Sequence, residues 1–397
     1  MSDARRPDPV VLRAPWLLDG TGAAPVADAA LWLDRGRVAY AGAAAGLPAA
    51  AAAVAARDFP GCTLLPGLVD VHVHLVASAG PDLAADVPDG EAAATLAAVA
   101  NARRQLDAGV TLVRDLGAPG AEAVEVGLAV EAGVVAGPRV LAAGPAVTMT
   151  GGHIAYLGRV ADGPEAMRRA VRANLALGAR CIKVVATGGV LTRGIDPREA
   201  AYTQAELDAL VDEAHRLGLT VAAHAIGEGG VAAALRAGVD SVEHGMFLDD
   251  AAIELFCATG ARYTPTFSAP YGILAGEQVP AWIKERARPA ADAQAASFQA
   301  AVAAGVRVVA GTDAGTPGNP HGGVAQEVAF MVAAGLDPLL AVRAVTGEAA
   351  DLLGVADRGV LRPGAAADVL VAGGEVAADI KALAHPAAVF QDGRQVR

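Results

Sequence analysis

Residues 64–75 read LLPGLVDVHVHL, and this stretch indicates the fold. Its run at 67–73 is short, apolar and rich in valine, which is typical of a strand buried in a parallel sheet. The run ends in His72 and His74. Side chains two residues apart on a strand point the same way, so both imidazoles are expected to project side by side where the strand ends.

Seven further β-branched runs follow, and each is succeeded by an alanine-rich amphipathic stretch. They centre on 110–113, 139–142, 181–185, 219–223, 241–242, 262–264 and 306–309. The helical pattern at 203–217, for example, begins with Thr203 and Glu206 at capping-box spacing. Eight strands that alternate with helices predict an α/β fold, a closed (β/α)8 TIM barrel. An open doubly wound sheet is disfavoured because no glycine-rich GxGxxG motif follows the first run.

Both ends of the chain have a different pattern, in which valine and leucine alternate with polar residues between hairpin signals. The signals are the dipeptides at 19–20, 363–364 and 392–393 and the tripeptide at 34–36. Neither end could bury a core alone, so we expect one small β-sandwich built from both ends. The predicted domains are 1–64 for the N-terminal part of the sandwich, 65–357 for the barrel and 358–397 for the C-terminal part.

Composition excludes several classes of function. The 397 residues carry 31 Lys and Arg against 43 Asp and Glu, a net charge of −12, with no basic run, which disfavours nucleic-acid binding. Three scattered cysteines fit neither a disulfide framework nor a CxxC metal pattern and favour a reducing, cytoplasmic location. The N-terminus lacks the apolar stretch of a signal peptide, and no apolar run approaches the ~20 residues that span a bilayer, so no membrane role is expected.

Three polar residues end other predicted strands. His224 ends the fifth run, His244 ends the sixth, and Asp313 follows the eighth. All lie where strands pass into loops, on the face at which barrel enzymes place their active sites. Together with His72 and His74 they are candidate metal ligands.

Lys183 lies inside the fourth apolar run, CIKVVA. A strand buried in a parallel barrel gives a lysine no route to water, and an unpaired buried ammonium is costly, so a partner is required. A protonated lysine has no lone pair for a metal. A direct ligand role therefore requires deprotonation or conversion of the amine into an anion.

Four imidazoles, one carboxylate and this lysine exceed the ligand set of one zinc ion, since a catalytic zinc takes about three protein ligands. Two metal ions that share a bridging hydroxide are the natural interpretation. An aspartate beside that hydroxide could take its proton and later pass it to the leaving group. Zinc is the first choice for imidazole-rich ligands, although manganese or cobalt would suit the carboxylate.

The order HxH, Lys, His, His, Asp, together with the opening at 64–75 and DRGVLRPGAAADVLV at 357–371, resembles the amidohydrolase superfamily. The resemblance covers essentially the whole chain and is strongest to imidazolonepropionase-like and Xaa-Pro dipeptidase-like members. It implies that Lys183 is carboxylated and bridges two divalent metal ions. It also assigns His72, His74 and Asp313 to the more buried metal ion, with Asp313 as general base, and His224 and His244 to the outer ion.

The stretch at 183–207, KVVATGGVLTRGIDPREAAYTQAEL, is similar to the peptide- and amide-cleaving branch of that superfamily. In that branch the loop after strand four and a Gly-Gly-His after strand three face the substrate. The resemblance therefore implies substrate-binding roles for His153, on a carboxylate or developing oxyanion, and for Tyr202. The sequence departs from relatives that read HAHG, because Ile226 replaces the second histidine, and this affects substrate preference more than metal binding.

Other polar residues receive simpler interpretations. His215 is expected to be a solvated helix residue, and His385 is expected to be a structural residue of the C-terminal sandwich. His321, which follows the last strand, is open to either a structural or a functional role. Arg193 is expected to be solvated in its loop and is not assigned to the site.

The predicted function is a binuclear metal-dependent hydrolase that cleaves the amide bond of a dipeptide or N-acyl amino acid with a free carboxylate. One alternative keeps the site but acts on a lactone, carbamate or phosphotriester. Another is mononuclear chemistry on a heterocycle, which Lys183 disfavours. A barrel that has lost its site and serves as a scaffold is the non-enzymatic alternative. The partner is a small-molecule substrate, and a homo-oligomer is compatible with the sequence.

Overall fold

The computed structural model describes residues 7–397, which separate into two compact units. The first comprises 7–69, Gln105–Leu112 and Val324–Arg397, and the second comprises Asp70–Arg104 and Val113–Gly323. Among the described residues, no helix combines the length and the apolar character that crossing a membrane would need.

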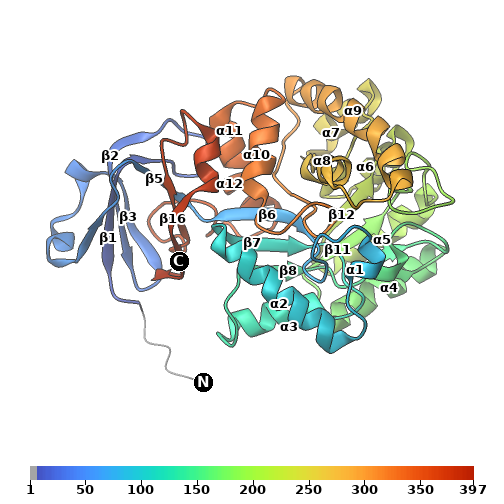
Figure 1. Cartoon of the computed structure of the whole chain (residues 1–397), viewed down its shortest axis with the longest axis horizontal. Coiled ribbons are helices and arrows are strands. Elements are labelled where there is room, and N and C mark those ends of the chain that lie inside the picture. The colour runs from blue at the N-terminus through green and yellow to red at the C-terminus, as the bar shows by residue number, and fades with distance from the viewer. Residues whose placement is uncertain (1–6) are drawn as a thin grey trace. The chain divides into compact units, whose positions relative to one another are not determined.

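Strands from both ends of the chain form one eight-stranded sheet in the first unit (Figure 1). Along the sheet they are β17 (Arg394–Gln395), β16 (Pro386–Gln391), β15 (Val369–Gly373), β5 (Cys62–Pro66), β1 (Val10–Leu17), β2 (Val26–Asp34) and β3 (Arg37–Ala43), with β4 (Ala56–Asp58) paired to β1. Strand β1 pairs in parallel with β4 and β5, and the other pairs are antiparallel. The contribution of both chain ends agrees with the sequence analysis, although the strands follow one continuous path.

Two of the predicted hairpin signals form tight turns. Arg35 and Gly36 join β2 to β3 with φ angles of 49° and 80°, and Asp392 and Gly393 join β16 to β17 with 46° and 79°. Two successive residues in the left-handed region match the right-handed twist of the strands they connect. The alternating pattern then buries one set of apolar side chains in a shared core that includes Leu12, Leu31, Leu64, Val371 and Phe390.

The second unit is a mixed α/β structure. A six-stranded parallel sheet runs in the order β10 (Gly158–Val160), β9 (Ala146–Thr148), β11 (Cys181–Val185), β12 (Thr220–Ala225), β13 (Ser241–His244) and β14 (Arg262–Thr264). A three-stranded sheet is formed by β6 (Leu68–Val73), β7 (Val110–Asp115) and β8 (Arg139–Ala142), of which 68–69 and 110–112 belong to the first unit and the rest to the second. Strands β11, β12 and β13 are buried almost throughout, as expected for a sheet covered on both faces.

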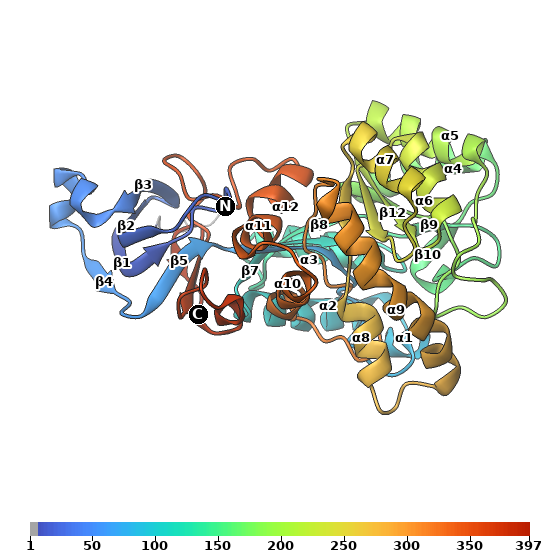
Figure 2. The ribbon, with the colours of Figure 1, turned by 90° about the horizontal axis from the view of Figure 1, so that it is seen from above.

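Helices follow most of these strands, and α4 to α7 lie along the outer side of the six-stranded sheet (Figure 2). The helices are α1 (Leu83–Asp86), α2 (Glu91–Asp107), α3 (Glu122–Glu131), α4 (Pro164–Leu177), α5 (Gln204–Arg216), α6 (Glu228–Ala237), α7 (Asp250–Thr259), α8 (Ser268–Ala275), α9 (Ala281–Ala303), α10 (Val324–Ala333), α11 (Pro338–Ala344) and α12 (Gly347–Leu352). Helix α5 begins with the predicted capping box, in which the Glu206 carboxylate accepts from the Thr203 backbone N–H at 2.9 Å.

The structure differs from the predicted barrel at the eighth run. Residues 306–309 form no named strand, and the sheets do not join into one closed eight-stranded ladder. The run pairs with β14 through two backbone hydrogen bonds at Tyr263. The Val309 N–H donates to the Tyr263 carbonyl, and the Tyr263 N–H donates to the Arg307 carbonyl, which is too few for a ladder. Isolated parallel bridges nevertheless join Val308 to Tyr263 and Ala314 to Val73. This segment therefore pairs with β14 through Val308 and with β6 through Ala314.

Candidate metal centre

All six sequence candidates for metal ligands line one cavity in the second unit. They come from the ends of β6, β11, β12 and β13 and from the segment after the eighth run, and all are buried. They are the sequence candidates His72, His74, Lys183, His224, His244 and Asp313. The structure therefore brings together residues that are separated by up to 241 positions in the chain.

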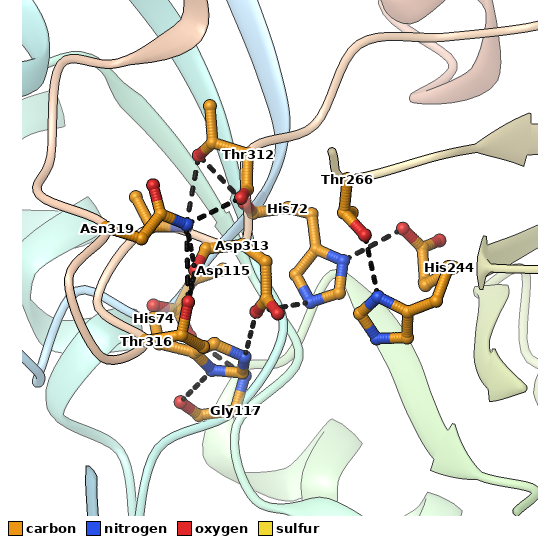
Figure 3. Close-up of polar contacts among 12 residues, drawn as sticks. His72, His74, Asp115, Gly117, His244, Thr266, Thr312, Asp313, Thr316 and Asn319 are labelled. Atoms are coloured by element: carbon orange, nitrogen blue, oxygen red, sulfur yellow. Dashed lines mark hydrogen bonds and ion pairs between the residues drawn. The ribbon is translucent and has the colours of Figure 1, made fainter. Parts of the chain in front are cut away.

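Asp313 lies between the first two histidines. Its Oδ1 atom is 3.3 Å from Nε2 of His72 and 3.2 Å from Nε2 of His74 (Figure 3). Potential ligand atoms of His72, His244 and Asp313 all lie within 4.8 Å of one another. The ring centroids of His224 and His244 are 4.6 Å apart. The imidazoles therefore form a continuous group around the cavity.

Each of the four histidines has one ring nitrogen placed against a fixed acceptor. Nδ1 of His72 faces the Glu243 carboxylate at 3.0 Å, and Nδ1 of His74 faces the Gly117 carbonyl at 3.2 Å. Nε2 of His224 faces the Gly188 carbonyl at 2.8 Å. A carbonyl or carboxylate accepts a hydrogen bond from an imidazole N–H. The proton therefore stays on that nitrogen, and the other nitrogen of each ring keeps its lone pair for a ligand.

His244 follows the same arrangement. Its Nδ1 lies 2.7 Å from Oγ1 of Thr266, whose hydroxyl donates to the Pro265 carbonyl at 2.6 Å (Figure 3). The hydroxyl proton is thereby directed away from His244, so Thr266 accepts from Nδ1 and Nε2 is left to bind a metal ion. Burial, reinforced by neighbouring charges, holds the pKa of His72 and of His244 well below the usual value, so both rings are neutral.

A buried ion pair braces the site, and the sequence analysis did not identify it. Arg114 of β7 and Glu243 of β13 are both fully buried, and the guanidinium donates to Oε1 of the carboxylate at 2.8 Å. Arg114 also donates to the Val71 carbonyl at 2.6 Å. The second oxygen of Glu243 accepts from His72. Removing one member of such a pair would leave an uncompensated buried charge. Because Glu243 is held by Arg114 and contacts His72, the pair also fixes the orientation of the His72 ring.

Lys183 is also buried, with 1% of its surface exposed. Within residues 7–397 its Nζ atom has no hydrogen-bond partner, so the described residues do not supply the partner that burial requires. Burial lowers the pKa of Lys183 to about 8, although Glu243 and Asp313 oppose the shift. The site therefore holds a readily deprotonated amine beside histidines with free lone pairs, and this donor set fits divalent metal ions.

The backbone is strained around the same cavity. Residues His244, Thr266 and Asp313 have φ angles of 80°, 55° and 58°, in the left-handed region that non-glycine residues rarely adopt. Ile154, which lines the cavity, has a φ of 48°. Such conformations persist only where surrounding contacts impose them, and they aim these side chains at one place.

The two predicted substrate residues are placed differently. His153 is buried, lines the cavity, and its ring centroid is 4.8 Å from that of His224. Tyr202 is buried as well, but its hydroxyl donates to the Ala161 carbonyl at 3.1 Å, and it is not among the residues that line the cavity. Ile226, at the position of the missing histidine, does line the cavity.

The remaining histidines and Arg193 lie outside the cavity lining. His321 is buried and its Nε2 faces the Ala77 carbonyl at 2.8 Å, which is a structural contact. His215 is partly exposed and lies 2.9 Å from the Asp240 carboxylate. His385 follows a short 3-10 helix, η4 (Ile380–Ala384), in the first unit. Arg193 stacks over the Trp282 ring at 4.1 Å.

Comparisons with known proteins identify a family for this chain. Residues 63–396 match the model of the amidohydrolase family. An ochratoxinase from Aspergillus niger is 33% identical over 415 residues, which cover 96% of this chain and 84% of that protein.

Solved structures are also similar over the whole chain. One is a Xaa-Pro dipeptidase with bound methionine in its active site, with a TM-score of 0.91 and 30% identity over 98% of this chain and all of that one. Another is a prolidase complexed with N-methylphosphonate-L-proline, with a TM-score of 0.88 and 29% identity over 98% of this chain and 99% of that one. The chain belongs to the amidohydrolase family and is a hydrolytic enzyme.

Proposed function

We propose that the enzyme hydrolyses the amide bond of a dipeptide or N-acyl amino acid at a centre of two divalent metal ions. His72, His74 and Asp313 would hold the inner ion, and His224 and His244 the outer one. The observation that carries the proposal is the set of four histidines, each with one ring nitrogen against a protein acceptor. The other nitrogen of His72 and of His74 lies beside the Asp313 carboxylate, the third proposed ligand of the inner ion. Two divalent ions, zinc as the first choice, would activate a shared water and polarise the scissile carbonyl.

Lys183 completes the proposed ligand set as a carbamate. Its neutral amine would attack the carbon of CO2, forming a C–N bond and releasing one proton. The product is an anion with two oxygen donors at a place where the unmodified side chain has no hydrogen-bond partner among the described residues. Its lowered pKa, about 8, supplies the neutral amine that this reaction needs. One carbamate could bridge both ions.

Asp313 is the proposed general base. Its carboxylate lies within 3.3 Å of Nε2 of both His72 and His74 and faces the cavity. It would accept a proton from the attacking water and return it to the leaving amine. His153 lines the cavity next to His224. It would bind the substrate carboxylate or the oxygen that gains charge in the transition state. Tyr202 is omitted because it does not line the cavity.

The substrate proposal is supported by the relatives. The similar structures include a Xaa-Pro dipeptidase with bound methionine and a prolidase with a phosphonate analogue of a proline compound, and the similar sequences include an ochratoxinase. One relative about 30% identical to this chain therefore holds an amino acid in its active site, and another binds a proline derivative. We extend this to a small amide substrate with a free carboxylate.

The proposed fold completes this assignment. We propose that the two parallel sheets, joined through residues 306–314, form a (β/α)8 barrel over 65–357. The parallel bridges at Val308 and Ala314 support this closure. We also propose that the sheet formed by 1–64 and 358–397 curls into a small sandwich, since its strands share one apolar core.

A substrate panel tests the choice of bond. We expect dipeptides and N-acyl amino acids to be cleaved with kcat/KM at least about tenfold above that for matched esters, lactones, carbamates and phosphotriesters. Release of the amine would measure cleavage of the amides. Release of the product acid or alcohol would measure cleavage of the esters, lactones, carbamates and phosphotriesters. The purified enzyme after treatment with a chelator serves as the control for background hydrolysis. A preference for the esters or phosphotriesters would overturn the proposed bond.

Metal content tests the binuclear centre. We expect about two divalent ions per chain by elemental analysis, and loss of turnover when a chelator removes them, with recovery on addition of Zn²⁺. Circular dichroism of the chelated protein would check that the fold persists. A maximum of one ion per chain at full activity would contradict the proposal and favour mononuclear chemistry.

A further inference from the structure

Part of the cavity lining is apolar. It includes Val190 and Leu191 of the loop at 188–195, Ile226 and Met246 after β12 and β13, and Ile273 of α8. We call these five residues the apolar wall. Among the described residues that line the cavity, Lys183 of β11 is the only lysine or arginine, and it is itself a candidate metal ligand. A charged group placed against the wall would lose its hydration without gaining a partner.

The loop at 188–195 forms part of this wall and also contacts the metal centre. The Gly188 carbonyl accepts from His224 at 2.8 Å, and Oγ1 of Thr192 lies 2.9 Å from Nδ1 of His153. At Gly189 a Cβ atom would lie only 2.3 Å from Nε2 of His153, so the backbone there lies directly against the imidazole. A displacement of this loop would therefore alter His153 and the wall together.

Arg286 of α9 holds the loop from outside the cavity. Its Nη2 atom donates to the carbonyls of Gly189 at 3.1 Å and Ile195 at 2.5 Å, and its Nε atom donates to the carbonyl of Val190 at 3.3 Å. One guanidinium thus joins both ends of the loop. Because Arg is charged and planar, it can satisfy these three carbonyls at once, whereas shorter or neutral side chains cannot.

Two further contacts seat the same loop on α8 and α9. Val190 and Leu191 pack against a cluster that contains Ile273, Ile283 and Ala287. Arg193 stacks on the Trp282 ring, also in α9, with 4.1 Å between its guanidinium carbon and the ring centroid. Helices α8 and α9 lie side by side (Figure 2). The loop is therefore held by polar contacts at its backbone and apolar contacts at its side chains.

We propose that Arg286 is a positioning residue that sets substrate selectivity, by clamping the loop at 188–195 so that the apolar wall accepts a bulky, uncharged apolar group of the substrate. The substrate class is then an amide in which the acyl group or the amino acid side chain is aromatic or branched aliphatic. This inference rests on the proposed amide hydrolysis. Arg286 itself touches no reacting atom in this scheme, because it is not among the residues that line the cavity and its Nε and Nη2 atoms donate to the loop carbonyls.

Kinetics of Arg286→Gln test the inference. With N-acetylglycine as the small substrate, and N-acetylphenylalanine and N-benzoylglycine as enlarged ones, we expect KM to rise about tenfold for at least one enlarged substrate. The kcat values, and the KM of N-acetylglycine, should stay within about threefold of wild type. Arg286→Lys should restore part of the loss, since an ammonium can donate to some of the same carbonyls.

The matched control is Arg288→Gln, which removes the same charge from an exposed position two residues along α9. It should leave all three KM values unchanged. An equal change for small and enlarged substrates in Arg286→Gln would indicate a merely structural role and would overturn the selectivity inference. Unchanged KM values in Arg286→Gln would overturn it as well.

Hydrogen exchange tests the clamp without any substrate. In Arg286→Gln, amides of residues 188–195 should exchange faster than in wild type, while those of β11 and β12 remain unchanged. This measurement remains valid even if the enzyme cleaves none of the amide substrates. Such a lack of cleavage would refute the proposed function but not the clamp. Unaltered exchange in the loop would refute the clamp even in a fully active amidase.

Discussion

Replacing Lys183 by alanine should abolish turnover, lowering kcat/KM on the order of a thousandfold or more, and should reduce the bound metal content. The reason is that in the proposed centre the bridging anion would disappear together with the amine, so the ions would lose a shared ligand. The apolar neighbours of Lys183 in β11 remain, and the cavity gains space where a buried polar group was unpartnered among the described residues. Steady-state kinetics and elemental analysis measure both effects.

Two controls separate this role from general damage. Lys381→Ala removes an exposed lysine in the first unit and should leave activity and metal content unchanged. Acetate or propionate at millimolar concentration should restore part of the turnover of Lys183→Ala, since a small carboxylate can occupy the place of the carbamate. Full activity of Lys183→Ala with normal metal content would refute the bridging role.

Asp313→Asn is expected to lower kcat about 10²- to 10⁴-fold, the range in which general acid–base groups contribute. Asparagine is chosen because Asp313 has a φ of 58°, a conformation that asparagine tolerates better than alanine. The amide keeps the side-chain shape but cannot accept the proton of the attacking water. The loss should appear mainly in kcat, measured on the best amide substrate of the panel.

The control for Asp313→Asn is Asp292→Asn, an exposed position on α9. It should behave as wild type. Thermal unfolding would establish that Asp313→Asn remains folded. A variant with normal metal content and kcat within threefold of wild type would exclude Asp313 as the general base.

Much of the site could be predicted because its ligands have an unusual context in the sequence. His72, His74, His224 and His244 end apolar runs, and a strand that ends in a polar residue at a barrel rim is a strong positional signal. Lys183 stands out for the complementary reason, as a charge inside an apolar run. The structure places all of them around one cavity.

The supporting residues were missed although a comparable signal was present. Arg114 lies in VTLVRD and Glu243 in SVEH, so both are charges within short buried strands like Lys183. Applying the same burial argument to them would have suggested an ion pair. Their partnership with each other could not be derived, because it depends on the spatial adjacency of β7 and β13 side chains inside the unit.

Arg286 gave no comparable signal. It lies in a long alanine-rich helix with several charges, a context typical of a solvated face. Its importance arises only because the loop at 188–195 folds back onto α9. The alternation of strands and helices was likewise predictable, whereas the eighth run was not, since 306–309 pairs through isolated bridges instead of a ladder.

The Arg114–Glu243 brace has a consequence for how the enzyme matures. The chain's own atoms supply every contact that orients His72: Arg114 holds Glu243, and Glu243 holds the imidazole. In the proposed metal centre, folding could therefore finish before any ion arrives, and loading would be a separate, reversible event. The metal ion found in a given preparation would then reflect which ions were available during expression and not the pathway of folding. One stock of apoprotein could also be reconstituted with different ions for comparison.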